Sequence, residues 1–398
     1  MATEAAGRFD PRIYALALTP VAFGTSAFGF TGILEPMAGD LSVTVAAAGQ
    51  LQTVFAVACA IGGPIVAALT TRVDRTRLLL FVLAALATMN TLAALAPSFS
   101  ALLGIRVVGG LFCALALPVA TSIAVTLADE PDRPKAIAVV LMGYTGAFLL
   151  GVPLGTALGD AFGWPAAFWL ATAFSLTALA IVAFTAPRGV LPPPSPEGAM
   201  RAALSGANPV LMLITLLSFA ATFATVSFAG PVVTASSGVS GGSIGAVQVA
   251  VGLGSLLGLP LGAAMAVNPS RAIPLLLSAV ILGQGLFTLG MLYDFGGVDT
   301  ALLALTMAFS AAALFALSPV VQTQLAANAG PAATLAFALN GSMLFLGQGV
   351  GAAAGGAVIA GVGIAWTGAV GAALGLAGLL LFAVALGRPR AAAPASQP

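Results

Sequence analysis

Long apolar stretches alternate with short polar ones along the whole chain. A transmembrane helix needs about 20 mostly apolar residues, and the stretches reach that length when charges and Pro/Gly clusters are used as boundaries. They predict an all-α polytopic membrane protein with twelve transmembrane helices. The predicted spans cover residues 13–38, 45–69, 78–96, 101–127, 136–159, 165–186, 209–234, 242–266, 272–293, 300–327, 333–359 and 364–386.

Composition agrees with this class and excludes several others. The 398 residues are 60% hydrophobic and 6% charged, with a mean hydropathy of +1.10, whereas soluble proteins carry about 25% charged residues. A formal net charge of +1 gives no basic surface for nucleic acid. The chain has no histidine, and both cysteines lie in apolar stretches. We therefore expect no enzyme activity, no metal and no cofactor.

The distribution of charge predicts the orientation of the spans. Twelve of the thirteen basic residues lie in alternate gaps or in the tails, and the opposite gaps contain only acids. Because positively charged loops stay in the cytoplasm, we expect a plasma-membrane protein with both termini and the middle loop inside. The basic residues are Arg8, Arg12, Arg72, Arg75, Arg77, Arg133, Lys135, Arg188, Arg201, Arg271, Arg388 and Arg390, and the acids are Asp40, Asp160, Asp294 and Asp299.

A Pro-rich middle loop divides the chain into two halves that resemble each other weakly. Ile61–Pro64 in span 2 corresponds to Leu257–Pro260 in span 8, at an offset of 196. A glycine pair in span 5 corresponds to one in span 11 at nearly the same offset. Such an internal repeat is typical of duplicated transporters. It predicts pseudo-symmetric six-helix bundles at residues 1–186 and 209–387, a cytoplasmic linker at 187–208 and a tail at 388–398.

Three spans carry glycines at every fourth position, which produces a flat helix face. Such faces allow close helix packing inside a membrane. The stripes are either static packing surfaces or moving interfaces between the halves, and their recurrence in both halves favours the moving interface slightly. They consist of Gly151, Gly155 and Gly159 in span 5, Gly254, Gly258 and Gly262 in span 8, and Gly347, Gly351 and Gly355 in span 11.

Several motifs together resemble the major facilitator superfamily over essentially the whole chain. More narrowly, the chain looks like its twelve-span drug:proton antiporters, in the arabinose-efflux-permease-like branch. Gly151–Thr156, which includes Pro153, resembles the span-5 antiporter motif, and Phe162–Trp169 resembles the aromatic corner after it. Arg106–Gly110 looks like the intramembrane Arg motif of span 4. Gly32–Asp40 resembles the end of the first span.

The loop between spans 2 and 3 also stands where this resemblance places a conserved cytoplasmic loop. The resemblance implies that its charges form an inner gate that pairs with neighbouring span ends when the transporter opens outward. The gating residues are Arg72, Asp74, Arg75 and Arg77. Thr71 and Asp74 depart from the pattern of the loop, Pro165 departs from the aromatic corner, and Glu35-Pro36 reverses the expected order. These departures make proton coupling less secure than the fold.

Two side chains inside the predicted spans carry charge at neutral pH, Glu35 and Arg106. Intramembrane charges are costly and normally find partners. From the rise of 1.5 Å per residue, both lie roughly 7–8 Å below the outer edge. We therefore predict an ion pair that couples proton binding to the change of access, with Asp40 as a second candidate. Two alternatives stay open: Glu35 reaches the outer water, or Arg106 is a structural strut that donates to span carbonyls.

The remaining polar side chains suggest a cavity suited to neutral, amphipathic or weakly anionic small molecules. The family architecture places spans 2, 5, 8 and 11 beside the cavity and span 3 outside it, so Asn90 is discounted. The predicted cavity residues are Phe23, Thr25, Phe30, Gln52, Tyr144, Gln248, Asn340 and Gln348.

The function expected is export of a small molecule by alternating access, driven by inward proton flow. The partners expected are this substrate, protons and the lipid bilayer, but no nucleic acid, and the protein is expected to be a monomer. The nearest alternative is a facilitator or importer without proton coupling. A membrane receptor that does not transport is more remote.

Overall fold

The computed structural model describes residues 10–191, 198–238, 242–296 and 298–386. The tails with Arg8, Arg388 and Arg390, and most of the Pro-rich stretch, lie outside the described residues. Eleven continuous helical stretches in the described part are long and apolar enough to cross a membrane. One of them, the 63-residue stretch Asp299–Gly361, contains two helices, α16 and α17, joined by the short 3₁₀ turn Gly330–Ala332. The predicted twelve crossings are therefore confirmed.

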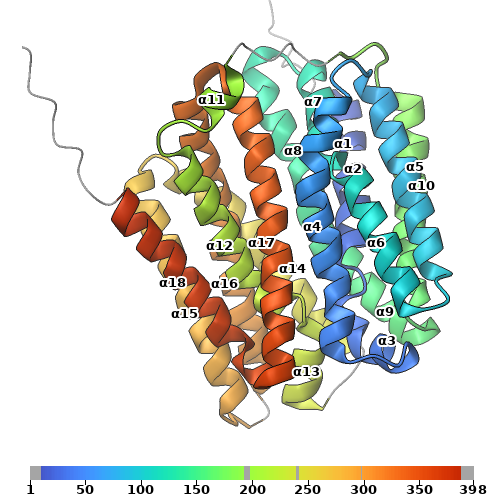
Figure 1. Cartoon of the computed structure of the whole chain (residues 1–398), viewed down its shortest axis with the longest axis vertical. Helices are drawn as coiled ribbons and strands as arrows, with labels where there is room; N and C mark the ends of the chain where they lie inside the picture. Colours follow the sequence, from blue (N-terminus) through green and yellow to red (C-terminus); the bar gives the residue numbers. More distant parts are fainter. Residues whose placement is uncertain (1–9, 192–197, 239–241, 297, 387–398) are drawn as a thin grey trace, which may run out of the picture.

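The first six spans lie on one side of the molecule (Figure 1), and three of them are interrupted. Span 1 changes to 3₁₀ geometry at Thr31–Ile33, span 4 is broken between α6 and α7, and span 5 has a π-helical turn at Ala147–Gly151. The helices are α1 (Pro11–Leu16), α2 (Leu18–Phe28), α3 (Leu34–Asp40), α4 (Val45–Leu69), α5 (Arg75–Ala94), α6 (Phe99–Cys113), α7 (Ala116–Leu127), α8 (Arg133–Gly146), α9 (Val152–Phe162) and α10 (Pro165–Thr185).

The last six spans form the other side of the molecule (Figure 1), after a short linker helix. The sequence predicts span 7 as one helix, but it breaks at Ser227–Phe228. The helices are α11 (Ala199–Ala203), α12 (Asn208–Val226), α13 (Ala229–Ser237), α14 (Gly242–Met265), α15 (Pro269–Leu292), α16 (Asp299–Ala329), α17 (Ala333–Gly361) and α18 (Thr367–Ala385), with a 3₁₀ turn at Ile364–Trp366.

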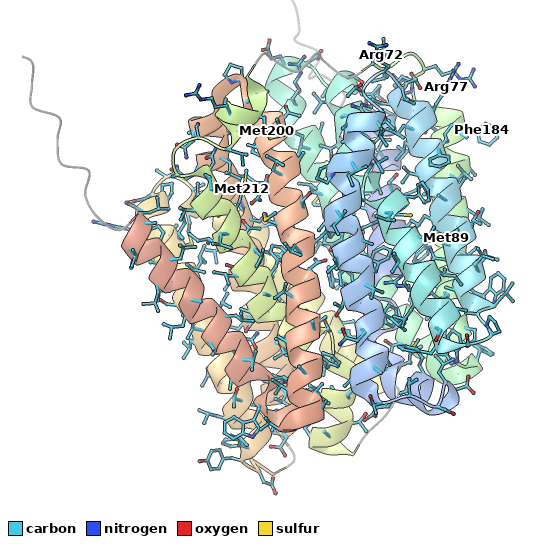
Figure 2. All side chains as sticks on the ribbon, in the orientation of Figure 1. Arg72, Arg77, Met89, Phe184, Met200 and Met212 are labelled. Carbon is cyan, nitrogen blue, oxygen red and sulfur yellow. The ribbon has the colours of Figure 1, made fainter. Side chains whose placement is uncertain are left out.

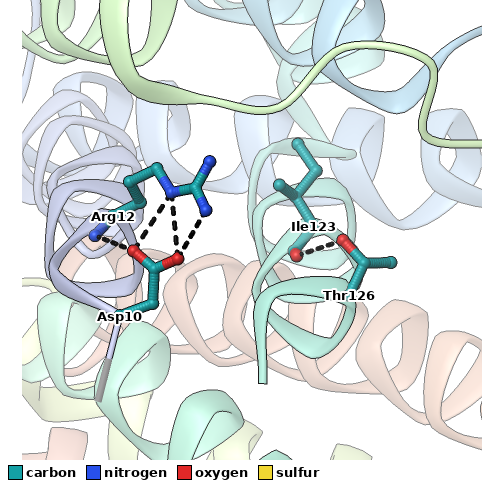
Figure 3. A network of polar contacts seen from close by, with 4 residues as sticks. All are labelled: Asp10, Arg12, Ile123 and Thr126. Carbon is teal, nitrogen blue, oxygen red and sulfur yellow. Dashed lines mark hydrogen bonds and ion pairs between the residues drawn. The ribbon is translucent and has the colours of Figure 1, made fainter. Parts of the chain in front are cut away.

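Polar side chains at the helix starts satisfy backbone N–H groups that have no partner within the helix. Thr44 caps α4 by accepting from Ala47 N at 3.1 Å, and Asp74 caps α5 by accepting from Arg77 N at 2.8 Å. At the start of α1, Asp10 accepts from Arg12 N at 2.9 Å and also binds the guanidinium (Figure 3). These caps fix where the chain turns between spans.

The three glycine stripes pack inside the halves, which corrects the expectation that they form the moving interface between them. A β-carbon added at Gly155 would overlap the backbone of Gly29 in span 1 of the same half. The stripe on α14 lies against backbone carbonyls of α16, and the stripe on α17 lies against those of α12. Close helix contact of this kind depends on the missing side chain. The stripes therefore hold each half together as a packed unit.

Candidate functional site

Helices α4 and α17 run antiparallel along the boundary between the halves (Figure 1). We call the end of the molecule that carries Asp40 the Asp40 end, and the end that carries the loop between α4 and α5 the Arg72 end. A β-carbon added at Gly356 would lie 2.9 Å from Gln50 Nε2, and one at Gly349 would lie 2.9 Å from Val57 Cγ2. The two helices are therefore in direct contact over their halves nearer the Asp40 end.

The contact between these two helices continues past Val57 and Gly349, because a β-carbon added at Gly63 would lie 3.7 Å from Ser342 Oγ. Nearer the Arg72 end, both helices also carry exposed residues. On α4 these include Ile61, Pro64 and Ala68, and on α17 they include Phe337 and Ala338. The closest contacts between α4 and α17 therefore lie toward the Asp40 end, at Gly349 and Gly356.

A second contact closes the Asp40 end between span 5 and α14. The Thr156 hydroxyl lies 2.8 Å from Gln248 Oε1, to which it donates, and also 3.0 Å from Val152 O. Gln248 is 4% exposed, and its Nε2 has no hydrogen-bond partner. Close by, a β-carbon at Gly230 would lie 2.5 Å from Gly32 O of the other half. No added side chain would fit there without moving the halves apart.

Aromatic rings from both halves meet between these helices and form what we call the aromatic cluster. Phe28 and Phe223 have ring centroids 5.4 Å apart, Phe23 and Phe345 are 5.6 Å apart, and Phe148 and Phe315 are 6.1 Å apart. Each pair joins the first half to the second. Such pairs are stabilised by ring electrostatics as well as by burial. The members of the cluster are Phe23, Phe28, Phe55, Tyr144, Phe148, Phe219, Phe223, Phe315 and Phe345.

One hydrogen bond crosses the aromatic cluster, from Gln348 Nε2 to the Tyr144 hydroxyl at 3.1 Å. Beside the cluster is a cavity of about 10 Å³, lined by side chains that include Phe28, Thr31, Phe148 and Gln248. That volume is enough for about one water molecule, whereas small-molecule sites measure about 300–1,000 Å³. The rings therefore leave room beside them for about one water molecule and not for a small-molecule ligand.

The structure brings together some of the predicted cavity residues and not others. Phe23, Tyr144, Gln248 and Gln348 all lie at the boundary between the halves. Thr25 instead lies against Gly151 and donates to Val21 O, and Phe30 stacks on Phe168 at 5.6 Å, both inside the first half. Gln52 and Asn340 are buried with unpaired side-chain atoms.

Arg106 adopts the strut arrangement in this conformation. It is 3% exposed, and it donates to Ser26 O at 2.8 Å, Ala27 O at 3.2 Å and Leu51 O at 3.4 Å. Ser26 and Ala27 lie in the last turn of α2, where carbonyls have no partner within the helix and attract a cation. The guanidinium carbon also lies 4.0 Å from the ring centroid of Phe55. Arg106 thus stabilises the point at which span 1 breaks.

The predicted pair between Glu35 and Arg106 is not formed in this conformation. Glu35 lies half-buried in the first turn of α3 and makes no hydrogen bond or ion pair within the described residues. Asp40 accepts from Trp164 Nε1 at 2.6 Å, which ties the end of span 1 to the turn before α10. The two candidate carboxylates therefore have different surroundings, one without a partner and one held by an indole.

The loop at the Arg72 end contacts the linker rather than the other half. Arg75 N donates to Val190 O at 2.7 Å, and the Thr76 hydroxyl donates to Pro187 O. Arg72 and Arg77 extend outward (Figure 2), and none of the loop's arginines forms an ion pair among the described residues. The predicted gate pairing of these charges is therefore not formed in this conformation.

Sequence reasoning missed most of the aromatic cluster, and it discounted Asn90 as a cavity residue. Asn90 is 2% exposed, accepts from Ser26 Oγ at 2.8 Å and lies inside the first half. Six cluster rings were not singled out, because a lone phenylalanine in a span is as compatible with lipid contact as with burial; they are Phe55, Phe148, Phe219, Phe223, Phe315 and Phe345. Gly32 and Gly356, which permit contact between the halves, do not belong to a run of glycines at every fourth position. The glycine pattern in the sequence therefore does not mark them.

Comparison with known proteins identifies the family. The family model described as Major Facilitator Superfamily matches residues 15–288. The chain is 35% identical over 363 residues to the chloramphenicol resistance protein of Streptomyces lividans, with 87% of this chain and 88% of the relative covered. It is 31% identical over 355 residues to the putative transporter AraJ of Escherichia coli K12, with 87% of each covered. A bacterial homologue of the human lysosomal transporter Spinster, solved inward-facing and unoccupied, matches in fold with a TM-score of 0.71 and 20% identity, covering 96% of each chain.

Proposed function

The chain belongs to the major facilitator superfamily and is a secondary transporter, and from this premise we propose that it exports a small apolar or amphipathic molecule in exchange for protons. The observation that carries this proposal is the aromatic cluster at the boundary between the halves, closed at the Asp40 end. Rings that separate would offer a substrate flat apolar walls and few charges. A relative named for chloramphenicol resistance supports export, because removing a toxic compound confers resistance.

The direction of transport rests on the charge pattern together with the closed end. The basic loops lie at the Arg72 end, which the positive-inside rule assigns to the cytoplasm. This conformation, closed at the Asp40 end, then has its outer end closed.

Proton coupling is assigned to Glu35 in this proposal. Glu35 lies half-buried in a span helix and has no hydrogen-bond partner among the described residues, whereas Asp160 in α9 is exposed. Its protonation would change the charge balance around Arg106 when the halves rearrange. We take Asp40 as the second choice, because its carboxylate already accepts a hydrogen bond from Trp164.

An uncoupled facilitator or importer is the second candidate function. It is favoured by one observation: Arg106 is satisfied by backbone carbonyls and does not need Glu35 to compensate it in this conformation. Glu35 would then be a half-exposed carboxylate with no role in transport.

Everted membrane vesicles separate the two functions. Chloramphenicol serves as the probe, and a pH-sensitive dye reports proton movement at the same time. If the protein exchanges its substrate for protons, chloramphenicol should enter the vesicles only when they are acidic inside. Its entry should also dissipate this pH gradient. Glu35→Gln should abolish the gradient dependence and leave binding of the probe measurable, whereas Asp160→Asn, an exposed carboxylate near the same end, should transport normally.

The outcomes of this experiment are distinct. If the chloramphenicol concentration inside the vesicles never exceeds the concentration outside, the result supports the facilitator. Gradient-driven uptake that is unchanged in Glu35→Gln refutes the assignment of the proton to Glu35 and brings Asp40 forward. If the protein neither transports nor binds chloramphenicol, the proposed substrate class is refuted for this probe.

A further inference from the structure

A buried ring at the break of span 7 lies between the two halves. Phe228 stands between α12 and α13, and its side chain is 0% exposed. Its backbone is held on both sides of the break, because its N–H donates to Thr225 O at 3.0 Å and its carbonyl accepts from Val232 N at 2.9 Å. The ring therefore extends from a backbone position that the second half fixes.

Glycines from both halves contact this ring. A β-carbon added at Gly49, on α4 of the first half, would overlap Phe228 Cε1 and lie 2.6 Å from Cζ. A β-carbon added at Gly355, on α17 of the second half, would lie 2.9 Å from Cε2, and one at Gly356 would lie 3.5 Å from Cζ. The ring fills the space that these missing side chains leave. We call the three glycines Gly49, Gly355 and Gly356 the glycine slot.

The space beside Gly49 is occupied by this ring and by no closer neighbour from another element. Outside α4 itself, the three atoms nearest to a β-carbon added at Gly49 all belong to Phe228, the third of them at 3.6 Å. An alanine at this position therefore conflicts with the ring alone. Phe30, at the break of span 1, has a different environment, because it stacks on Phe168 of its own half at 5.6 Å between ring centroids.

The glycine slot is complete when the Asp40 end is closed. Gly355 and Gly356 belong to the same half as Phe228, whereas Gly49 belongs to the other half. Separation of the halves at this end removes the contact between the ring and Gly49. It also exposes the edge of an aromatic ring that is fully buried here, which is unfavourable in water. The ring thus makes a contact that the closed state has and the open state lacks.

We propose that Phe228 is a positioning residue for closure of the Asp40 end, and that its ring, seated in the glycine slot, holds α4 of the first half against α17 of the second. The absence of a side chain at Gly49 is then a requirement of closure, because a larger residue would keep the halves apart. The proposal concerns the change of access itself. It does not depend on which molecule or ion is carried.

Distances between spin labels on the two halves test the proposal. Asp160→Cys and Val362→Cys place the labels at exposed positions. Gly49→Ala should raise the population open at the Asp40 end about tenfold or more, because the overlap with the ring exists in the closed state alone. Gly63→Ala is the matched control on the same helix and at the same boundary. Its β-carbon would lie 3.7 Å from Ser342 Oγ, which is an ordinary contact, so the distances should not change.

Removal of the ring separates positioning from packing. Phe228→Ala should also raise the open population. Phe287→Ala should lower the unfolding midpoint without changing the distances, because this buried ring lies against Gly368 within the second half. Gly49→Ala combined with Phe228→Ala should be less open than Gly49→Ala alone, since the added methyl group then lies in the space that the ring has left.

Three results would overturn the proposal. The first is the same distance distribution in Gly49→Ala and Gly63→Ala. The second is a combined variant that is as open as Gly49→Ala or more so, because the conflict would then not be with the ring. If Gly49→Ala does not fold, the comparison of the two ring variants decides, and equal distances in Phe228→Ala and Phe287→Ala would be the third.

Discussion

Thr156→Val is expected to open the Asp40 end. The change keeps the shape of the side chain but removes the hydroxyl that donates to Gln248 Oε1. Because Gln248 Nε2 already lacks a partner, the whole amide is then buried without a hydrogen bond. Such a loss costs about 1–3 kcal/mol in the closed state alone, since the open state exposes the amide to water. The population open at the Asp40 end should therefore rise by a factor of about 5–150.

Spin-label distances across the Asp40 end measure this shift. Asp160→Cys and Val362→Cys place labels on exposed positions of the two halves, and the natural cysteines are buried. Thr172→Val is the matched control, because the Thr172 hydroxyl donates to Phe168 O within the first half.

A second variant at the same contact tests the reasoning more sharply. Gln248→Leu removes the entire amide and leaves no buried polar atom of that side chain unpaired, so its shift should be smaller than that of Thr156→Val. If Thr156→Val gives the same distance distribution as Thr172→Val, or if Gln248→Leu opens the end further than Thr156→Val does, the energetic account of this contact is wrong.

Three further measurements follow from the structure and the charge pattern. Cysteine labelling in whole cells should modify Asp160→Cys from outside and Arg271→Cys only after permeabilisation; the reverse result would invert the topology. Trp164→Phe, which removes the bond to the carboxylate at the end of span 1, should lower the unfolding midpoint more than Trp366→Phe, where no bond is lost among the described residues. The adjacent Arg12 guanidinium lowers the pKa of Asp10 below its usual value of 3.8. The ionised Asp10 cap should therefore stabilise α1 above pH 3.8, and this stabilisation should be lost as the pH falls through the lowered pKa. Hydrogen exchange of the α1 amides measures the loss.

The number of spans could be predicted from the sequence because length and apolarity alone determine it. The predicted span boundaries agree with the observed helix ends to within a few residues for spans such as Val45–Leu69 and Pro165–Thr185. The breaks could not be predicted, since they depend on tertiary partners. The break after Phe28 is stabilised by Arg106 from span 4, and no local pattern near Phe28 shows that partner.

The candidate site was predicted less well than the fold, for a physical reason. Charged residues such as Arg106 are conspicuous in an apolar span, so they are easily singled out. Their partners are not, because a guanidinium is satisfied equally by a carboxylate or by backbone carbonyls, which every residue has. Glycine spacing likewise shows that a helix packs closely, but it does not show whether the neighbour belongs to the same half, as Gly29 does for Gly155.

The aromatic cluster has a consequence for which molecules this protein can carry. Three ring pairs join the halves, and each is worth roughly 0.5–1.5 kcal/mol beyond the area it buries. A guest that enters must separate these pairs and contact both walls in their place. A molecule too short to span the gap gains only one wall and does not offset the contacts it breaks. Under the proposed function, the protein would therefore select by a minimum size: water and small metabolites would leave the rings together, and only a bulkier apolar guest would hold them apart.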